Sequence, residues 1–590
     1  MSEKAERVED RLADFTRDRR ILILSLMALI VGAISAIVAY ALVWLIAVIT
    51  NISFYQRFSA VFQSPEQNRL GYLVILVPVI GGLIIGLTAR YGSEKIRGHG
   101  IPEALEAILF GRSRMELRVA VLKPLTSAIS IGTGGPFGAE GPIIMTGGAV
   151  GSLFAQRFHL SSAERKTLLV AGAAGGMSAI FAAPVAAVLL AVELLLFEWK
   201  PRSFIPVAIA SAAAFALRIP LLGTGPTFPL TPHAMLGGEG LAFALLVGIL
   251  AGLASGALTT LVYACEDLFA KLPIHWMWWP AIGGLCVGIG GLIEPRVLGV
   301  GYETIHGLLR GEIIGGAIIG ILIGKSLVWS LALGSGTSGG VLAPLLMMGA
   351  ALGAVEAGFI PVGDKGLWAL ISMAAMMGGT MRSPLTAMVF ALELTQDINL
   401  LPGLLVGCIA AHGVTVLLLR RSILTEKVAR RGYHIMREYS VDPLSVVRVS
   451  EVMYEDVYTL PAKMKVTELS DRIARHDPLV ADRQGLPIVD ENQRLVGIIT
   501  RGDVLRSLDE GANGNTTVLE AGSRDLVITY PDEILHEAVT KMLRHDIGRL
   551  PVVSRHDHHH LVGYLGRANL MAARLRQLDE EHVRERGSNT

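Results

Sequence analysis

The sequence feature that most constrains this chain is a run of thirty residues without a charged side chain, from Ile21 to Thr50. A helix needs about 20 apolar residues to cross the hydrocarbon core of a bilayer, whereas the apolar region of a secretory signal covers about 7–15 residues. The run therefore predicts a membrane-spanning helix. Residues 1–20 before it hold twelve charged residues and end in Arg19-Arg20. This basic flank predicts a cytoplasmic N-terminal segment.

Charged residues are unevenly distributed along the chain. Residues 451–590 hold 41 of the 103 Lys, Arg, Asp and Glu residues, as in a soluble domain, whereas the much longer 1–450 hold the other 62. We therefore expect one large membrane domain followed by a soluble domain. The formal net charge of +1 offers no basic excess for a nucleic-acid partner. The three cysteines lack C-x-x-C spacing, which argues against a disulfide framework or a cysteine-based metal site.

Further apolar runs follow, and they are of two kinds. Clear runs lie near residues 71–90, 203–219, 240–263, 276–294, 312–333 and 401–419. Short runs broken by glycine lie at 143–155, 167–180, 183–197, 341–357, 366–378 and 384–394. Short interrupted segments are typical of half-helices whose ends meet inside the membrane. Basic residues from Arg420 to Arg431 follow the last run, so the C-terminal side is also predicted to be cytoplasmic, with an even number of crossings.

Two sequence stretches recur in the same order, which indicates an internal duplication. GTGGPFGAEGPIIMTGGAVG (132–151) resembles GSGTSGGVLAPLLMMGAALG (334–353), and a second pair, ending near Glu193 and Glu393, follows at nearly the same offset. Two matches at one offset predict a duplicated half, and an odd number of crossings in each half makes the repeats inverted. The predicted repeats are residues 21–220 and 221–435, approximately.

Three turns rich in glycine and proline each precede an apolar helix, at GHGIP (98–102), GAEGP (138–142) and GGVLAP (339–344). Proline just inside a helix start, preceded by glycine, marks an N-terminus. Helix N-termini that converge within a membrane present free N–H groups and positive dipole ends, which favour an anion. No nucleophile–base pair or set of metal ligands accompanies these turns, so the sequence favours neither an enzyme nor a metal site.

These turns resemble the hallmark sequences GSGIP, G(K/R)EGP and GxFxP of the CLC family of chloride channels and chloride/proton antiporters. The resemblance covers about residues 20–435. It implies a multi-pass α-helical membrane protein of inverted-repeat architecture, forming a homodimer with one anion pore per subunit. It also implies that Glu140 is the gating glutamate, whose carboxylate occupies the outer anion site. The implied anion-binding residues are His99, Gly100, Ile101, Gly138, Ala139, Glu140, Gly141, Val341, Leu342 and Leu424.

Three of these residues depart from the family pattern. His99 stands where GSGIP has serine, and its imidazole either donates to an anion or makes a structural hydrogen bond. Leu342 replaces the phenylalanine of GxFxP, but its expected contribution is its backbone N–H. Leu424 replaces the tyrosine of the family's SIYT, which predicts a looser inner gate with altered anion preference or a tolerated change.

A fourth departure concerns proton transfer. Antiporters of this family carry two adjacent glutamates, and Glu193 matches the first. Leu194 stands at the second position, where the family's glutamate is the internal proton acceptor. Glu193 is thus a candidate for a proton path, and the loss of the second carboxylate favours weak proton coupling or channel behaviour.

The soluble part contains two similar units, residues 451–510 and 517–577, with short β-branched runs bounded by turn residues. They resemble a tandem pair of cystathionine-β-synthase (CBS) domains, an α/β pair that often binds adenosine nucleotides. The family's G-x-x-[ST]-x-x-D motif matches Gly497 to Asp503, so Thr500 and Asp503 are the expected nucleotide-binding residues, next to Arg501. The second unit has Gly566 and Asn569 instead, which leaves at most one good site or a structural pair that binds nothing.

The function expected from these features is anion transport, with chloride as the transported ion and the pore gated by Glu140. Channel-like or weakly proton-coupled conduction is favoured. The alternatives are chloride/proton antiport, transport of another anion such as fluoride or nitrate, and a membrane nucleotide sensor in which the pore is secondary. The expected location is the plasma (inner) membrane, with both termini in the cytoplasm and ATP or a related nucleotide at the CBS pair.

Overall fold

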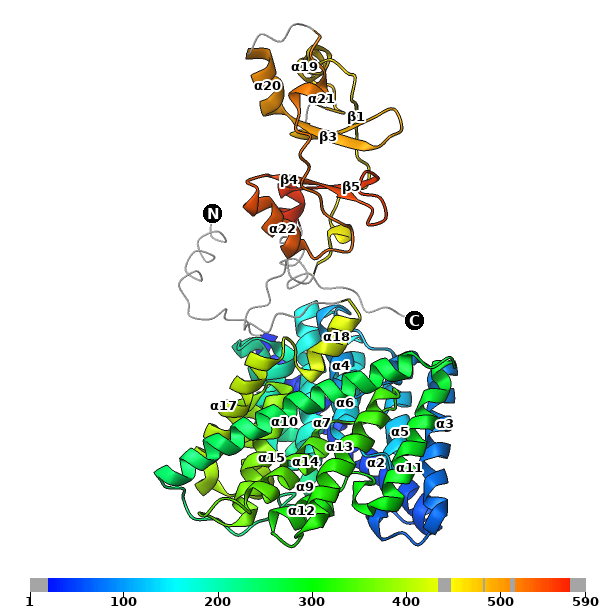
Figure 1. Ribbon diagram of the computed structural model, residues 1–590, viewed down its shortest axis with the longest axis vertical. Coiled ribbons are helices and arrows are strands. Elements are labelled where there is room, and N and C mark those ends of the chain that lie inside the picture. The colour runs from blue at the N-terminus through cyan, green and yellow to red at the C-terminus, as the bar shows by residue number, and fades with distance from the viewer. Residues whose placement is uncertain (1–19, 433–446, 481–482, 510–514, 573–590) are drawn as a thin grey trace. The chain divides into compact units, whose positions relative to one another are not determined.

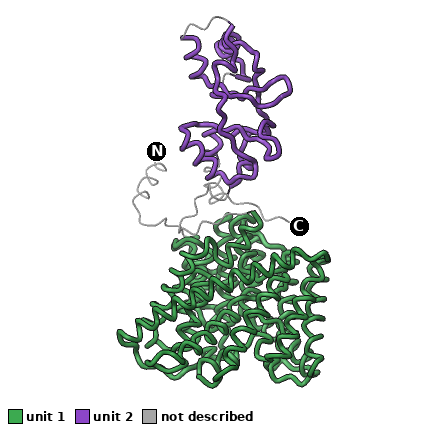
Figure 2. The backbone as a smooth tube through the Cα atoms, viewed as in Figure 1, with its two compact units in different colours: residues 1–433, 584–590 green, residues 434–583 purple. Residues whose placement is uncertain are grey.

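A computed structural model describes residues 20–432, 447–480, 483–509 and 515–572. The chain divides into two compact units, residues 1–433 with 584–590, and residues 434–583 (Figure 2). The first is called the membrane unit below and the second the tail unit. The predicted N-terminal segment, up to residue 19, lies outside the described residues.

The membrane unit is built from helices, as predicted (Figure 1). Within the described residues, seven helices are long and apolar enough to cross a bilayer. Their main helices are α2 (Arg20–Tyr55), α3 (Leu76–Tyr91), α9 (Pro201–Leu222), α10 (Gly238–Ala270), α11 (Trp279–Ile293), α13 (Gly316–Gly334) and α17 (Leu401–Leu418). Each coincides with one of the clear apolar runs of the sequence, because length and uninterrupted hydrophobicity alone determine such segments.

The shorter interrupted runs form paired helices in each half of the membrane unit. In the first half α6 (Glu140–Ala155) packs against α7 (Ser162–Phe181), and α8 (Pro184–Leu190) follows. In the second half α14 (Leu342–Glu356) packs against α15 (Lys365–Met381), and α16 (Pro384–Thr395) follows. Glycine allows the close approach, since a Cβ at Gly147 or Gly353 would overlap a carbonyl oxygen of the facing helix.

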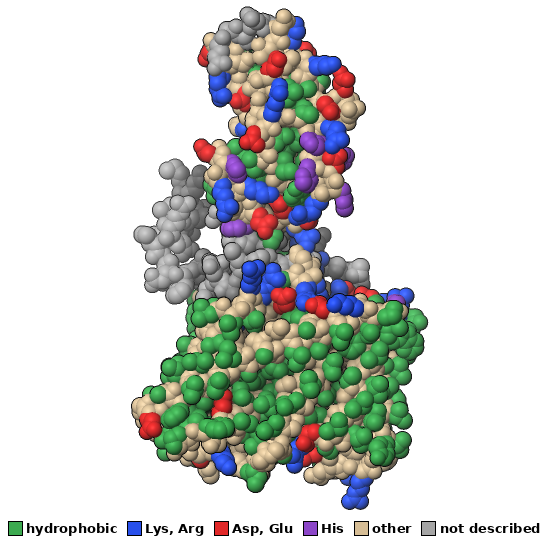
Figure 3. Space-filling view, viewed as in Figure 1, with side chains coloured by type: hydrophobic (Ala, Val, Ile, Leu, Met, Phe, Trp, Pro, Cys, Tyr) green, Lys and Arg blue, Asp and Glu red, His purple; other side chains and the backbone are tan. Residues whose placement is uncertain are grey.

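The outer surface of the membrane unit is apolar. Figure 3 shows hydrophobic side chains over most of its visible face, with Lys, Arg, Asp and Glu gathered towards its two edges. On α2 alone, Leu22, Leu26 and Ile37 expose 74%, 63% and 54% of their surface. A soluble protein rarely exposes so large an apolar area, so this face suits contact with lipid.

The tail unit contains two small sheets, each with its own core. The first has the order β1-β2-β3, with β1 (Leu460–Pro461) parallel and β3 (Leu495–Thr500) antiparallel to the central β2 (Gly485–Val489). The second pairs β4 (Arg549–Val553) with β5 (Leu561–Gly566) in antiparallel fashion. The helices are α19 (Val466–Ala474), α20 (Arg501–Asp509), α21 (Val518–Ala521) and α22 (Leu535–Arg544). The two strand pairs occur where the repeated sequence predicts them.

Candidate functional site

The structure brings the three predicted turns together inside the membrane unit. Gly138 and Gly340 exchange two backbone hydrogen bonds, with N–O distances of 3.2 and 2.9 Å, which join the start of α6 to the start of α14. Gly98 forms a parallel bridge with Ser338 and precedes α4 (Ile101–Leu109). Three helix N-termini from both halves of the chain therefore converge, which produces the positive environment expected for an anion.

Glu140 lies at the centre of this convergence. It is the first residue of α6 and its side chain is fully buried. Its Oε1 accepts a hydrogen bond from the backbone N–H of Ala343 in α14, at 3.1 Å. Its Oε2 is buried and has no hydrogen-bond partner among the described residues. The carboxylate of one half thus accepts a hydrogen bond at the helix start of the other half.

Glycines create the space that this carboxylate fills. A Cβ on Gly138 would overlap Oε2 of Glu140, and a Cβ on Gly340 would lie 2.5 Å from the same atom. Gly141 has a related role, since a Cβ there would overlap the carbonyl oxygen of His99. Only glycine lets the three backbones approach one another so closely.

The remaining predicted anion-binding residues lie on the same helix starts, except Leu424. His99 is 2% exposed, and its Nδ1 has no hydrogen-bond partner within the described part of the chain. Gly100 has a φ of +93°, which suits glycine and allows α4 to begin at Ile101. Val341 and Leu342 are fully buried at the start of α14.

Leu424 comes from α18 (Ile423–Arg430), a short helix that packs against α4 and α15. The side chain of Leu424 is fully buried. The tyrosine hydroxyl that the family carries at this position is replaced by an aliphatic group, so the side chain of this residue supplies no donor to an anion.

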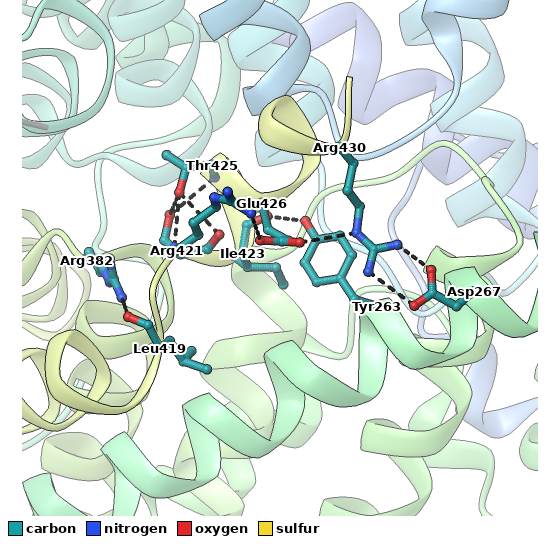
Figure 4. Close-up of polar contacts among 10 residues, drawn as sticks. Tyr263, Asp267, Arg382, Leu419, Arg421, Ile423, Thr425, Glu426 and Arg430 are labelled. Atoms are coloured by element: carbon teal, nitrogen blue, oxygen red, sulfur yellow. Dashed lines mark hydrogen bonds and ion pairs between the residues drawn. The ribbon is translucent and has the colours of Figure 1, made fainter. Parts of the chain in front are cut away.

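Polar contacts fix α18 in place, as Figure 4 shows. The Tyr263 hydroxyl of α10 donates to the Ile423 carbonyl at 2.5 Å. Arg430 pairs with Asp267 at 2.5 Å, and its guanidinium lies over the Tyr263 ring, 4.7 Å from the centroid. These contacts tie α18, the helix that carries Leu424, to α10.

Two fully buried lysines were missed by the sequence reasoning. Lys123 donates to the carbonyls of Ile96 and Gly98 at 2.8 and 2.6 Å. Lys325 donates to the carbonyls of Val297 and Gly299 at 2.9 and 2.8 Å. Each lysine thus holds the backbone just before a short helix of its own half, α4 or α12 (Tyr302–Leu309). The one sequence signal that could have found them is their spacing, since the two lysines occupy corresponding positions of the two repeats.

Glu193 and Glu393 have matching roles in the two repeats. Glu193 Oε2 accepts from the backbone N–H and the hydroxyl of Thr386, at 2.8 and 2.5 Å, at the start of α16. Glu393 accepts from the backbone N–H groups of Val185 and Ala186, at 2.9 and 2.7 Å, at the start of α8. Each carboxylate caps the half-helix of the other repeat, an arrangement that the helix dipole favours.

The position directly after Glu193, the candidate for a proton path, carries no carboxylate. Leu194, the residue after Glu193, is fully buried in a π-helical turn, Ala191–Leu196. Glu193 itself is occupied with the cap of α16.

The predicted nucleotide-binding residues lie together in the tail unit. Asp503 Oδ2 accepts from the Thr500 backbone N–H and hydroxyl, at 2.8 and 2.7 Å, at the start of α20. Both residues line a cavity of about 490 Å³ together with Arg501. In the second unit, Asn569 Oδ1 accepts from the Gly566 N–H at 2.9 Å, and Asn569 Nδ2 donates to the Val452 carbonyl at 2.6 Å.

Inverted repeats, paired half-helices and a carboxylate held among helix N-termini define a membrane transport protein for anions. Comparisons with known sequences agree with this class. The sequence pattern of the voltage-gated chloride channel family matches residues 81–416, and the CBS-domain pattern matches 449–510 and 518–576. The chain therefore belongs to the CLC family of anion channels and transporters, and its tail is a CBS-domain pair.

Individual relatives support the assignment. The chain is 31% identical over 369 residues to the voltage-gated ClC-type chloride channel ClcB of Escherichia coli O81 (strain ED1a), covering 61% of this chain and 87% of that protein. The ClcB of Shigella flexneri is also 31% identical, over 62% of this chain and 89% of its own length.

Solved structures share the fold. A slow cyanobacterial Cl⁻/H⁺ antiporter superimposes with a TM-score of 0.63 at 22% identity, over 70% of this chain and 98% of the other. A CLC-type fluoride/proton antiporter gives 0.58 at 18% identity, over 68% and 97%. A eukaryotic CLC transporter gives 0.61 at 18% identity, over 93% and 98%.

Proposed function

We propose that this protein moves chloride through the convergence of α4, α6 and α14, and that the Glu140 carboxylate gates the path. The observation that supports the proposal is the hydrogen bond from the Ala343 N–H to Glu140 Oε1. A backbone donor at a helix start binds a carboxylate oxygen and a halide by the same chemistry. An anion and the carboxylate therefore compete for one position.

Gating follows from this competition. When the Glu140 side chain is protonated or turns away, the N–H of Ala343 and the amides of Ala139, Glu140 and Gly141 become available to chloride, whereas the Gly138 N–H stays bonded to the Gly340 carbonyl. Lys325, in the same half of the chain as α14, donates to the carbonyls of Val297 and Gly299 and so holds the backbone before α12. Glycines at positions 138 and 340 leave the volume that the anion then fills.

Proton coupling is proposed to be weak. A proton crossing the membrane unit requires groups that accept it, because a bare charge is costly in a low-dielectric interior. Leu194 offers no such group, and Glu193 already accepts bonds from α16.

Antiport is a second candidate function, since two of the similar structures are a Cl⁻/H⁺ antiporter and a fluoride/proton antiporter. His99 and Leu424 leave the anion preference open, with fluoride or nitrate as the other candidates.

The cellular setting belongs to the same proposal. We place the protein in the plasma (inner) membrane as a homodimer, with both termini in the cytoplasm and an adenosine nucleotide such as ATP bound at Thr500 and Asp503. The density of basic residues before α2 and after α17 supports the orientation.

Ion flux from proteoliposomes tests the pore proposal. Chloride efflux and proton movement are recorded together for the wild type and for Glu140→Gln, which keeps the side chain's size but removes its charge. The expected result is chloride efflux in both proteins, at least as fast in Glu140→Gln, with no proton movement driven by chloride in the variant. Unchanged pH dependence of the chloride flux in Glu140→Gln would contradict the gating role.

A further inference from the structure

The tail unit has a second cavity, and nothing described so far assigns a ligand to it. Its volume is about 730 Å³, within the range of small-molecule sites. Residues of both CBS units line it, among them Tyr454, Arg483, Arg549, Tyr564 and Arg567. It lies against β2 and β5, which the Tyr564 hydroxyl joins by donating to the Gly485 carbonyl at 3.0 Å.

The two cavities of the tail unit differ in the sign of their charge. The 730 Å³ cavity is lined by three arginines, Arg483, Arg549 and Arg567, and one aspartate. The 490 Å³ cavity beside Thr500 is lined by two arginines and three aspartates. A multiply charged anion is therefore attracted to the larger cavity and repelled by the smaller one, unless its other contacts compensate.

The arginines of the larger cavity are available to a ligand. Among the described residues, neither Arg483 nor Arg567 forms an ion pair, and Arg549 donates to a neutral acceptor, the Gln484 side chain. Burial raises the pKa of Tyr564 to about 12, while Arg549 and Arg483 act to lower it, so both guanidinium groups are near the cavity's aromatic wall. Guanidinium groups in such numbers match phosphate oxygens in geometry and charge.

The larger cavity lacks the hydroxyl and carboxylate side chains that are expected to bind a nucleoside in the smaller one. Where the first unit offers Thr500 and Asp503, the second has Gly566 and Asn569. Both ends of the Asn569 amide are already bonded, to the Gly566 N–H and the Val452 carbonyl. Recognition in this cavity therefore depends on phosphate groups rather than on ribose.

We propose that the 730 Å³ cavity binds a compact ligand with two or more linked phosphates, which pair with Arg483, Arg549 and Arg567. Arg549 lines both cavities. A polyphosphate that engages it offsets the charge of one of the two arginines in the 490 Å³ cavity, which leaves Arg501 alone against the three aspartates. The ligand consequently opposes nucleotide binding beside Asp503. This inference is independent of the pore, since binding alone is measured.

Titration calorimetry with inorganic tripolyphosphate on the full-length protein in detergent tests the proposal. Arg567→Gln is expected to weaken binding about tenfold or more, because it removes a charge-assisted contact. Arg501→Gln is the matched control, since it removes the same charge at the start of α20 and lines only the smaller cavity. It is expected to leave tripolyphosphate affinity unchanged.

Further measurements separate the two cavities. Arg483→Gln repeats the test at a second position if Arg567→Gln fails to fold, and Arg567→Lys is expected to retain part of the affinity. Tripolyphosphate is also expected to weaken ATP binding in the wild type but much less in Arg549→Gln. Absence of binding at millimolar tripolyphosphate would overturn the proposal. So would loss of binding in Arg501→Gln or Asp503→Ala with full binding in Arg567→Gln, which would place the anion in the smaller cavity.

Discussion

The reciprocal caps made by Glu193 and Glu393 lead to a prediction that separates a structural role from a role in proton transfer. Each carboxylate accepts at least two hydrogen bonds at the start of a half-helix in the other repeat. Glutamine keeps the size of the side chain but loses its charge and one acceptor oxygen. Glu193→Gln and Glu393→Gln therefore form a matched pair of variants.

The expected cost follows from these contacts. Losing one hydrogen bond to a charged acceptor costs about 1.5–3 kcal/mol, and losing a negative charge at a helix N-terminus costs about 0.3–1 kcal/mol. Each variant is therefore expected to be about 2–4 kcal/mol less stable than the wild type. Because the two caps are equivalent, the two losses should be similar.

The assay combines stability with transport. Thermal unfolding of both purified variants, followed by intrinsic fluorescence in one detergent, should show similar decreases in midpoint. Chloride and proton fluxes from liposomes should keep the wild-type ratio in both variants. Loss of proton movement in Glu193→Gln alone, with normal stability, would refute the capping account and make Glu193 a proton carrier.

Three further predictions concern single contacts. Gly138→Ala places a methyl group in the volume that the Glu140 carboxylate and the anion are proposed to share, so chloride efflux at neutral pH should fall; an unchanged rate would contradict this. Tyr263→Phe removes the bond to the Ile423 carbonyl and should lower stability by about 0.5–1.5 kcal/mol, as measured by thermal unfolding. Asp503→Ala should weaken ATP binding to the full-length protein by about 1.5–3 kcal/mol in calorimetry, whereas equal affinity would exclude a ribose contact there.

The helical framework and the position of the site follow from local sequence features. Thirty uncharged residues from Ile21 predict α2, and proline after glycine at Pro142 and Pro344 predicts the helix starts that meet at the site. These signals are local, because membrane length and helix-start chemistry depend only on neighbouring residues. They also predicted that Glu140 lies among helix N-termini.

The contacts between the two halves of the membrane unit could not be predicted from local sequence features. The bond from Ala343 to Glu140 joins residues 203 positions apart, and the cap of α16 by Glu193 joins residues 193 apart. Local pattern does not specify which distant groups meet. The roles of the buried Lys123 and Lys325 could not be predicted either. The role of a lysine in an apolar stretch depends on which distant backbone carbonyls its ammonium group contacts.

The most direct test of the central claim is to locate an anion in Glu140→Gln. Crystals of the wild type and the variant grown in bromide would be compared by anomalous diffraction. A bromide peak is expected in the variant within hydrogen-bonding distance of the Ala343 nitrogen, in the place of the Glu140 carboxylate, and no such peak is expected in the wild type. The same peak in both proteins, or its absence from the variant at saturating bromide, would contradict competition between the carboxylate and an anion.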